Sequence, residues 1–190
     1  MEEFINKDQE ALLFLNGLGT KSFDPFWILM SDKWIWVPLY IIFVYLLYKN
    51  YKLRNLIFIL IFIGLGITIS DQIATIFKFG VLRLRPCHNP FLETKMRLVT
   101  CGGMYGFYSS HASNTFFLAT FLSALLGKKY KFFTISVFLW AIIVSYSRIY
   151  LGVHFPFDVA FGAAAGFLLG GLFSVLAKRT IRIKRLKNYH

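Results

Sequence analysis

SRIYLGVHFPFD, residues 147–158, carries an arginine, a histidine and an aspartate between two long apolar segments. Charged groups so close to a bilayer are costly, and by default they mark a functional site. Two other polar clusters lie where one apolar segment ends or the next begins: KFGVLRLRP at residues 78–86 and YSSH at residues 108–111. We expect the three clusters to meet on one face of a membrane and to form a site that handles phosphate.

The composition of the chain favours a single integral-membrane domain. Of its 190 residues, 57% are hydrophobic and 22 are Phe, which is too apolar for an ordinary soluble domain. Residues 1–10 are polar and mostly acidic, without the basic start of a cleavable signal peptide. We therefore expect one membrane domain over residues 1–190, with a motif-bearing core at about 56–177 and a basic tail at 178–190.

The apolar segments predict an all-α fold, a polytopic membrane helical bundle with about five transmembrane helices. The expected spans are Trp34–Tyr48, Leu56–Phe77, Ala112–Leu126, Phe132–Tyr146 and Val159–Ala177. The second span has 22 residues, and about 33 Å of helix is enough to cross a bilayer. The first span is short, so we expect residues 26–30 to extend it at an angle and Pro38 to act as its kink.

The N-terminal segment is too polar to cross a membrane. Within Met1–Leu15, one helical stripe can hold Phe4, Ile5, Leu12 and Leu15, while the acidic residues lie elsewhere. This pattern predicts an amphipathic helix that lies on the membrane surface. The alternative is a loosely held tail.

Two features of the spans predict helix–helix contacts. Asp71, in the second span, is expected to face the bundle and bond a neighbouring helix. In the last span, Gly162, Gly166 and Gly170 recur at four-residue spacing, which lets another helix approach closely. We expect this stripe to serve packing within the chain; the alternative is a dimer face.

The distribution of charge predicts the orientation in the membrane. Residues 49–55, residues 127–131 and the tail together carry twelve Lys and Arg and no Asp or Glu. The positive-inside rule places these three segments in the cytoplasm, and the N-terminal helix and the polar clusters outside. The net charge of +12 is then a signal of topology and of contact with anionic lipid. It does not indicate nucleic-acid binding, because the chain shows no groove of stacking aromatics.

The first polar cluster offers two cations. Lys78 and Arg85 are seven residues apart, so both would point the same way if the stretch were helical. Arg85 can engage phosphate oxygens with two hydrogen bonds, whereas Lys78 acts as a point charge. We expect Pro86 to end the helix. The alternative is that both side chains simply extend to lipid head groups.

The second cluster, Ser109, Ser110 and His111, precedes the third span. The start of a helix offers free N–H groups and a positive dipole end, which together bind anions. The Ser109 hydroxyl can add a further contact, and His111 is a candidate proton donor. The alternative is that Ser109 or Ser110 only caps the helix.

The third cluster combines a candidate phosphate ligand, Arg148, with His154 and Asp158, which are four residues apart. A carboxylate beside an imidazole fixes its tautomer and stabilises the imidazolium. An imidazole held in this way can attack phosphorus and form a covalent intermediate. The alternative is a structural His–Asp pair that joins two helices.

A metal site is a weaker interpretation of the same residues. Two histidines and one aspartate could ligate zinc, but the neighbouring cations would repel it. Phosphoryl transfer needs positioning and charge cancellation, which Lys78, Arg85 and Arg148 can supply. We therefore expect no metal and no cofactor.

The three clusters resemble the motifs of the type 2 phosphatidic acid phosphatase (PAP2) superfamily of membrane lipid phosphatases. The first motif (Lys, six residues, Arg-Pro) and the third motif (Ser-Arg, five residues, His, three residues, Asp) match these residues: Lys78, Arg85, Pro86, Ser147, Arg148, His154 and Asp158. The second motif, Pro-Ser-Gly-His, is matched by Ser109 and His111. Tyr108 replaces its proline and Ser110 its glycine, and the backbone N–H of Ser110 remains available.

The resemblance implies a metal-independent hydrolase with a helical bundle. His154 would be the nucleophile, Asp158 its partner, and His111 the acid that protonates the leaving oxygen. The phosphate would be held by the following residues: Lys78, Arg85, Ser109, Ser110, Arg148 and Ser147. Many relatives have six spans, whereas this chain is expected to have five and a surface helix.

These expectations define a lipid phosphatase of a bacterial cytoplasmic membrane, with its site on the outer face. Undecaprenyl diphosphate is the first-choice substrate, because an outward-facing site is where that carrier is released. The alternatives are lipid A 1-phosphate, phosphatidylglycerol phosphate and phosphatidate. From other classes, a vanadium haloperoxidase-like enzyme and a non-catalytic lipid-phosphate binder or transporter stay open. The expected partner is a membrane lipid phosphate and no nucleic acid, with the oligomeric state open.

The two cysteines, Cys87 and Cys101, lie in one loop on the side expected to be oxidising, so they predict a disulfide. Closing a loop of this length stabilises the fold by roughly 3 kcal/mol in the chain-entropy account. The alternative is two unpaired thiols.

Overall fold

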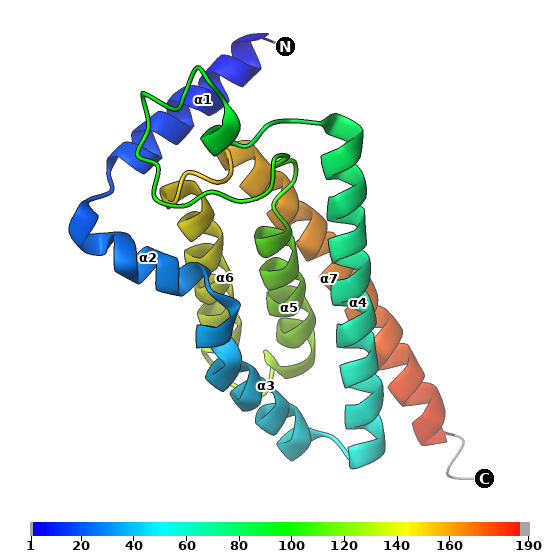
Figure 1. The fold of residues 1–190 in the computed structure, drawn as a ribbon. Helices are drawn as coiled ribbons and strands as arrows, with labels where there is room; N and C mark the ends of the chain where they lie inside the picture. Colours follow the sequence, from blue (N-terminus) through cyan, green and yellow to red (C-terminus); the bar gives the residue numbers. More distant parts are fainter. Residues whose placement is uncertain (1, 187–190) are drawn as a thin grey trace.

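The computed structural model describes the backbone of residues 2–186 and the side chains through Ile181. Figure 1 shows a bundle of seven α-helices within this range. They are α1 Glu2–Gly17, α2 Asp24–Ser31, α3 Val37–Asn50, α4 Leu53–Val81, α5 Ser110–Leu126, α6 Phe133–Tyr150 and α7 Pro156–Leu186. Short 3-10 helices cover Lys21–Phe23, Lys33–Trp36 and Pro86–His88. The predicted all-α bundle is confirmed.

Helix α5 is the centre of the bundle, with α4, α6 and α7 packed around it (Figure 1). Its side chains Phe117, Phe121 and Leu126 are fully buried. Between membrane helices such side chains stabilise the bundle through close van der Waals packing, because lipid is as apolar as they are. The Ser109–His111 cluster is therefore attached to the most enclosed element of the fold.

The glycine stripe of α7 packs against α5, as expected. A Cβ atom placed on Gly166 would lie 2.1 Å from the carbonyl oxygen of Ser113. On Gly162 it would lie 2.5 Å from the carbonyl oxygen of Ser109, which caps α5. On Gly170 it would lie 2.5 Å from the carbonyl oxygen of Phe117. The two backbones thus approach closely only because these residues lack side chains.

This contact predicts that Gly166→Ala forces α5 and α7 apart. The expected loss of stability is about 1–3 kcal/mol, as for other overpacked interfaces. Gly171→Ala is the matched control on the same helix, since a Cβ atom there meets nothing within 4 Å. Thermal unfolding in detergent should give a lower Tm for Gly166→Ala alone. Equal Tm values for the two variants would contradict the packing argument.

Helices α4, α6 and α7 are each long and apolar enough to cross a membrane, and the bent pair of residues 21–31 and 33–50 would form a fourth span. With 17 residues, α5 is about 26 Å long and is enclosed by the others. Helix α7 continues to Leu186, so most of the predicted tail is helical, whereas Lys187 lies outside the described residues. In position these helices correspond to the five predicted spans, but of the described helices only three, or four with the bent pair, are long and apolar enough to cross a membrane.

The bend of the first span lies at Asp32. The two helical segments on either side of it meet at 62°. The Asp32 carboxylate accepts a hydrogen bond from the N–H of Trp34, at 3.0 Å, and so starts the second segment. The predicted angled extension is confirmed, but the assignment of the kink to Pro38 is wrong. Pro38 lies in the first turn of α3, where a helix tolerates proline without bending.

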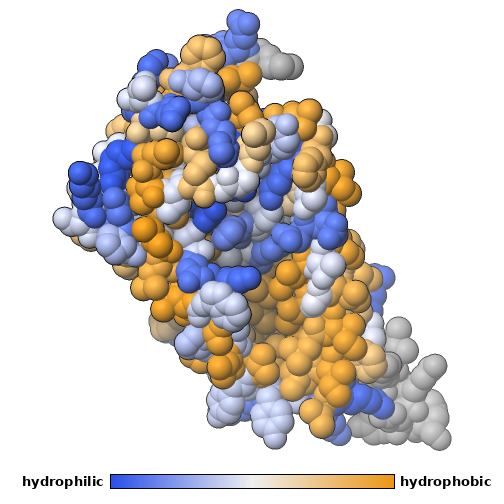
Figure 2. Space-filling view, viewed as in Figure 1, coloured by the Kyte–Doolittle hydropathy of each residue, from blue (hydrophilic) through white to orange (hydrophobic). Residues whose placement is uncertain are grey.

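The two ends of the bundle differ in chemistry. The C-terminus and the α3–α4 connection lie at one end, and α1 with the loop between α4 and α5 lies at the other (Figure 1). Figure 2 shows hydrophilic residues gathered over the end that carries α1, and hydrophobic residues over much of the surface around α4. The three polar clusters occupy the α1 end, opposite the basic loops.

Helix α1 docks on the bundle through an unexpected stripe. The buried residues are Asp8, Leu12 and Asn16, spaced by four. Phe4 and Ile5, predicted to share the apolar stripe with Leu12, are 51% and 41% exposed. The helix does lie at the surface, but its polar side chains bond the ends of the spanning helices. The Asn16 amide, for example, donates to the carbonyl oxygen of Tyr150 at 2.8 Å.

Candidate active site

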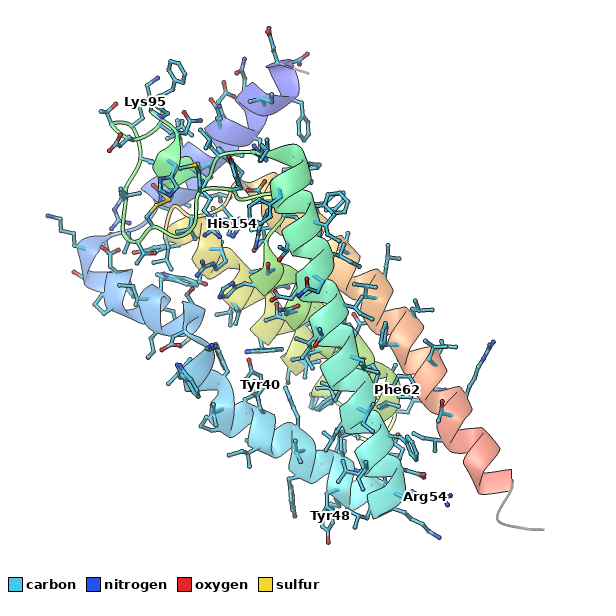
Figure 3. The ribbon with its side chains drawn as sticks, turned by 45° about the vertical axis from the view of Figure 1, so that its right-hand side comes forward. Tyr40, Tyr48, Arg54, Phe62, Lys95 and His154 are labelled. Carbon is cyan, nitrogen blue, oxygen red and sulfur yellow. A yellow bond between two sulfur atoms is a disulfide. The ribbon has the colours of Figure 1, made fainter. Side chains whose placement is uncertain are left out.

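The three polar clusters converge at one end of the bundle, where Figure 3 labels His154 near the end of α4. The Lys78 ammonium, at the end of α4, donates to the Ser110 hydroxyl at 2.7 Å. The N–H of Ser109 donates to the carbonyl oxygen of Asp158 at 3.1 Å. Each cluster is therefore bonded to at least one of the others, as the sequence led us to expect.

Arg85 reaches this site from a loop. Helix α4 ends at Val81, because Leu82 adopts a left-handed conformation with φ of 54°. Arg85 is extended, and its N–H donates to the carbonyl oxygen of Met104 at 2.9 Å. The expectation that Pro86 ends the helix, with Lys78 and Arg85 on one helical face, is wrong. The two cations meet because the chain turns at Leu82.

The loop from Cys87 to Tyr108 folds tightly over Arg85. A Cβ atom on Gly102 would lie 2.5 Å from the Arg85 guanidinium, and one on Gly106 would lie 3.1 Å from the Asp158 carboxylate. The Arg85 Nε–H donates to the carbonyl oxygen of Tyr105 at 3.2 Å. These contacts orient the guanidinium, and the absence of side chains at the two glycines makes room for it.

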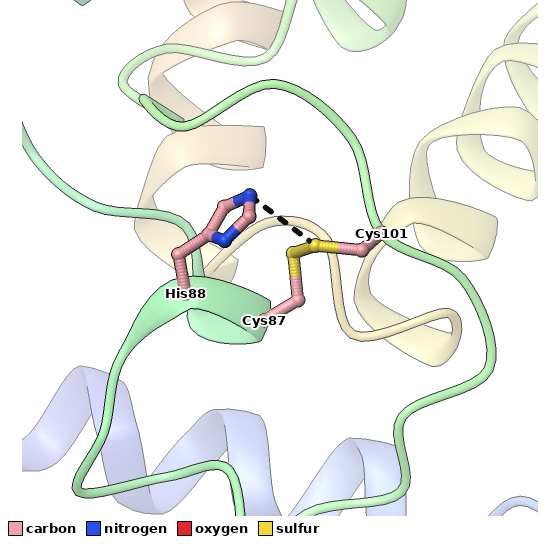
Figure 4. A group of neighbouring side chains, drawn as sticks. All are labelled: Cys87, His88 and Cys101. Carbon is pink, nitrogen blue, oxygen red and sulfur yellow. Dashed lines mark hydrogen bonds between the residues drawn. A yellow bond between two sulfur atoms is a disulfide. The ribbon is translucent and has the colours of Figure 1, made fainter.

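A disulfide between Cys87 and Cys101 closes the same loop, with 5.8 Å between the Cα atoms (Figure 4). The imidazole of His88 lies beside it, with Nε2 3.0 Å from the carbonyl oxygen of Gly102 and 3.4 Å from Sγ of Cys101. Because both sulfurs are joined to each other, neither is a thiolate that could ligate a metal. The bridge fixes the loop segment that contacts Arg85.

The residues that differ from the second PAP2 motif have defined contacts. Tyr108, in place of proline, is fully buried, and its ring lies 5.4 Å from the rings of Phe77 and Phe161. It joins α4 to α7. Ser110, in place of glycine, accepts the hydrogen bond from Lys78, which a glycine could not do.

Ser109 is the N-cap of α5, since its hydroxyl accepts from the N–H of Ala112 at 3.5 Å. Its side chain is fully buried. Ser147 is also fully buried, and its hydroxyl donates to the carbonyl oxygen of Val144 at 2.6 Å. The structure thus gives both serines a hydrogen-bonding role within their own helices.

His154 and Asp158 form a buried pair, with relative exposures of 1% and 0%. Nδ1 of His154 lies 3.5 Å from the nearer carboxylate oxygen and has no hydrogen-bond partner among the described residues. That carboxylate oxygen accepts from the N–H of Phe155 at 3.1 Å. The carboxylate is thus held in place, at a distance that a small ring movement would shorten to a hydrogen bond.

The charges around His154 favour its neutral form. Burial lowers the pKa of His154 well below its ordinary value, and the positive charges of Arg85, Arg148 and Lys78 lower it further. Burial also lowers the pKa of Arg85, while the Asp158 carboxylate acts in the opposite direction. At neutral pH the imidazole is uncharged and has a lone pair to offer, which a nucleophile requires.

Arg148 extends from the last turn of α6 to the hydroxyl of Ser31 on α2. Its Nε–H is buried without a hydrogen-bond partner. A buried N–H that is left unpaired is costly, and an anion would satisfy it. Arg148 therefore stays a candidate phosphate ligand, as the sequence predicted.

Arg83 and Asp8 belong to this site, although sequence reasoning missed both. The Arg83 guanidinium donates to Asp158 at 2.7 Å and to Asp8 at 2.6 Å, and it lies 3.9 Å from the centre of the Phe155 ring. Asp8 also accepts from the N–H of Phe157 at 2.9 Å. One sequence pattern could have indicated the role of Asp8: it lies four residues before Leu12, and Asn16 lies four residues after Leu12, so the three share one helical face of α1.

A groove of about 400 Å³ begins at this site. It runs between α3, α4 and α5, from Ser110 and His111 to Leu47 and Leu122. Its lining is mainly aliphatic and aromatic, and it includes Asp71. Asp71 contacts Asn114 of the neighbouring α5, as expected, but its side chain is exposed at the groove and does not face the interior of the bundle.

Comparison with known proteins identifies the family. Residues 55–182 match the model of the PAP2 superfamily. The chain belongs to the PAP2 superfamily. It is 38% identical to a lipid A 4'-phosphatase of Bacteroides thetaiotaomicron, over 97% of this chain and 84% of that protein. It is 29% identical to an undecaprenyl-diphosphatase of Sulfolobus acidocaldarius, over 92% and 74%.

The fold agrees with this membership. A PAP2-type phosphatidylglycerolphosphate phosphatase from Bacillus subtilis superposes with a TM-score of 0.74 over 94% of this chain and 88% of that one, at 20% identity. At that identity the likeness concerns the fold alone. Together with the family match, the membrane-spanning helices define this PAP2 protein as a multi-pass membrane lipid phosphatase, a hydrolase of phosphate monoesters.

Proposed function

We propose that this PAP2 enzyme removes phosphate from a glycolipid of the lipid A type, with the 4'-phosphate as the first candidate. The observation that carries the proposal is the apolar groove between α3, α4 and α5, whose lining includes two serines that are bonded to cations of the site. Ser110 is bonded to Lys78, and Ser31 is bonded to Arg148. Cations at one end and hydrocarbon-like walls along the rest suit a phosphate head group with its chains still in the bilayer.

In the proposed first step, Nε2 of His154 attacks phosphorus and the bond from phosphorus to the lipid oxygen breaks. Burial and the charges of the neighbouring cations lower the pKa of His111 to about 3 in the free enzyme. The bound phosphate cancels those charges, so His111 takes up a proton when the substrate binds and gives it to the leaving oxygen. Asp158 accepts the Nδ1–H of the imidazolium that forms. The equatorial oxygens are neutralised by Lys78, Arg85 and Arg148, which would supply the charge that metal ions supply elsewhere.

In the proposed second step, a water molecule attacks the phosphohistidine. His111, now neutral, takes a proton from that water, and the bond from phosphorus to Nε2 breaks. Inorganic phosphate leaves, and His154 returns to its neutral form. The low pKa of His154 supports this step, because neutral imidazole is the favoured state of the free enzyme.

Undecaprenyl diphosphate is the second candidate. The relative that acts on it is less similar to this chain than the lipid A 4'-phosphatase, at 29% against 38% identity. The polyprenyl chain of undecaprenyl diphosphate would also fit the apolar walls of the groove. On either substrate, the basic loops opposite the site support an active site on the outer face of a bacterial cytoplasmic membrane.

The test is phosphate release by the purified enzyme in detergent. The panel contains lipid A, undecaprenyl diphosphate, phosphatidate, phosphatidylglycerol phosphate and soluble p-nitrophenyl phosphate. We expect kcat/KM for lipid A to exceed that of the other lipids by about tenfold, or about 1.4 kcal/mol of transition-state preference. Mass spectrometry of the product identifies which phosphate is lost. A tenfold lead for undecaprenyl diphosphate would replace the first candidate with the second.

Two controls test the mechanism and the groove. Treatment with EDTA should leave the rate unchanged, because the three cations neutralise the phosphate; inhibition that zinc or magnesium reverses would reject this mechanism. The soluble ester should be the poorest substrate, since it gains nothing from the groove. A soluble ester as good as the lipids would show that the groove does not bind substrate.

A further inference from the structure

The wall of the groove carries one polar pair, Asp71 and Asn114, below the catalytic end. The Asn114 amide nitrogen donates to the Asp71 carboxylate at 3.5 Å, and both residues line the groove. A carboxylate within a spanning helix is energetically costly, so its presence there indicates a function. Among the residues that the structure describes, none forms an ion pair with Asp71, and the proposed catalytic steps do not use this carboxylate.

The pair offers mainly hydrogen-bond acceptors, because one N–H of the Asn114 amide is directed at the Asp71 carboxylate. Since the Asn114 nitrogen faces the carboxylate, its carbonyl oxygen is left over, and that atom is buried without a partner. Asp71 is exposed to the groove and has further lone pairs. The nearby Thr115 hydroxyl donates elsewhere, to the His111 carbonyl oxygen. The missing donors would have to come from a bound molecule or water.

The position of the pair fits the upper part of a lipid. Asp71 precedes Lys78 by seven residues, or about 10 Å along α4. Asn114 follows His111 by three residues, or about 4.5 Å along α5. A phosphate held by Lys78 would therefore place the carbons closest to the head group, and not the chain ends, beside the pair.

We propose that Asp71 and Asn114 form a subsite for a hydrogen-bond donor on the substrate, a hydroxyl or an amide N–H near the head-group end of its chains. The inference rests on the proposed function of the groove. The subsite would favour lipids with amide-linked or hydroxylated acyl chains over polyprenyl diphosphates and diester glycerolipids, because the latter two lack such donors. The subsite thus selects among lipid phosphates that the cations alone would bind equally.

The test uses two probes that share a phosphate monoester and two chains. Ceramide 1-phosphate carries an amide N–H and a hydroxyl close to its phosphate, whereas phosphatidate carries only esters there. We expect the wild-type enzyme to prefer ceramide 1-phosphate by about tenfold in kcat/KM, the effect of one or two buried hydrogen bonds. In Asp71→Leu and Asn114→Leu the ratio should fall to within about threefold, with phosphatidate turnover retained.

Ile67→Ala is the matched control, one turn from Asp71 on the same wall of the groove. It should affect both lipids equally, because it removes only apolar contact. Equal losses for both lipids in Asp71→Leu would show that the pair merely links α4 to α5, and would overturn the proposal. So would a wild-type enzyme without preference.

Dissociation constants separate this proposal from the proposed function. If neither lipid is hydrolysed, the phosphatase assignment for these substrates fails, but binding still reports on the subsite. We expect ceramide 1-phosphate to bind wild type about tenfold more tightly than Asp71→Leu, and phosphatidate to bind both alike. Equal dissociation constants for the two lipids, in wild type and in Asp71→Leu alike, would overturn the proposed subsite.

Discussion

His154→Ala is expected to abolish phosphate release, with kcat lower by on the order of 10⁴-fold or more, as for loss of a covalent nucleophile. The imidazole is the buried base that three cations keep neutral, and water in its place lacks both its position and its reactivity. The measurement is release of ³²P from labelled lipid, together with quenching in alkaline detergent, which preserves a phosphorus–nitrogen bond on the enzyme. We expect wild type to retain acid-labile label and the variant to retain none.

Two other histidine variants test the assignment. His88→Ala is the control, because His88 is exposed beside the disulfide and outside the cationic cluster; its kcat should stay within about threefold of wild type. His111→Ala should still acquire label from a substrate with a good leaving group, but should release it slowly. Label on His154→Ala would identify a different nucleophile and reject the mechanism.

The sequence predicted the chemistry of this site better than its geometry. Residue type and spacing were enough to bring together Lys78, Arg85 and the His154–Asp158 pair, because each lies next to the end of an apolar segment. The prediction that Lys78 and Arg85 share one helical face was wrong, because the helix ends in a turn at Leu82. Leu82 adopts a positive φ there, although it is not a glycine. No local sequence pattern predicts a left-handed conformation at a leucine.

Long-range polar contacts were the other limit. Asp8 and Arg83 are 75 residues apart, and the sequence gives no reason to pair them. An apolar stripe was the expected docking face of α1, because membrane-surface helices usually bury one. The actual face pairs Asp8 with Arg83 and Asn16 with the Tyr150 carbonyl, so tertiary hydrogen bonds overrode the local pattern.

Arg83→Met is expected to lower kcat by about 10–100-fold while KM changes little, by analogy with groups that orient a reactive imidazole from behind. Arg83 does not touch the nucleophile: it donates to Asp158, which lies 3.5 Å from the His154 ring. Without it, the Asp158 carboxylate keeps one hydrogen bond within the described part of the chain, from the N–H of Phe155, and can turn away. Steady-state kinetics on the preferred lipid separates kcat from KM.

The same variant should also be less stable, because it leaves Asp8 and Asp158, exposed by 5% and 0% in their side chains, as uncompensated buried charges. Stability and positioning can be separated by a second change. Asp8→Asn removes one of those charges and retains an acceptor for the Phe157 N–H. In Arg83→Met with Asp8→Asn, we expect Tm to recover in part while kcat stays low, because the contact to Asp158 is still missing. If kcat recovered in parallel with Tm, Arg83 would serve only to hold α1 on the bundle. If Asp8→Asn alone lowered kcat as much as Arg83→Met, the orienting contact would depend on the whole chain of bonds from α1 to His154.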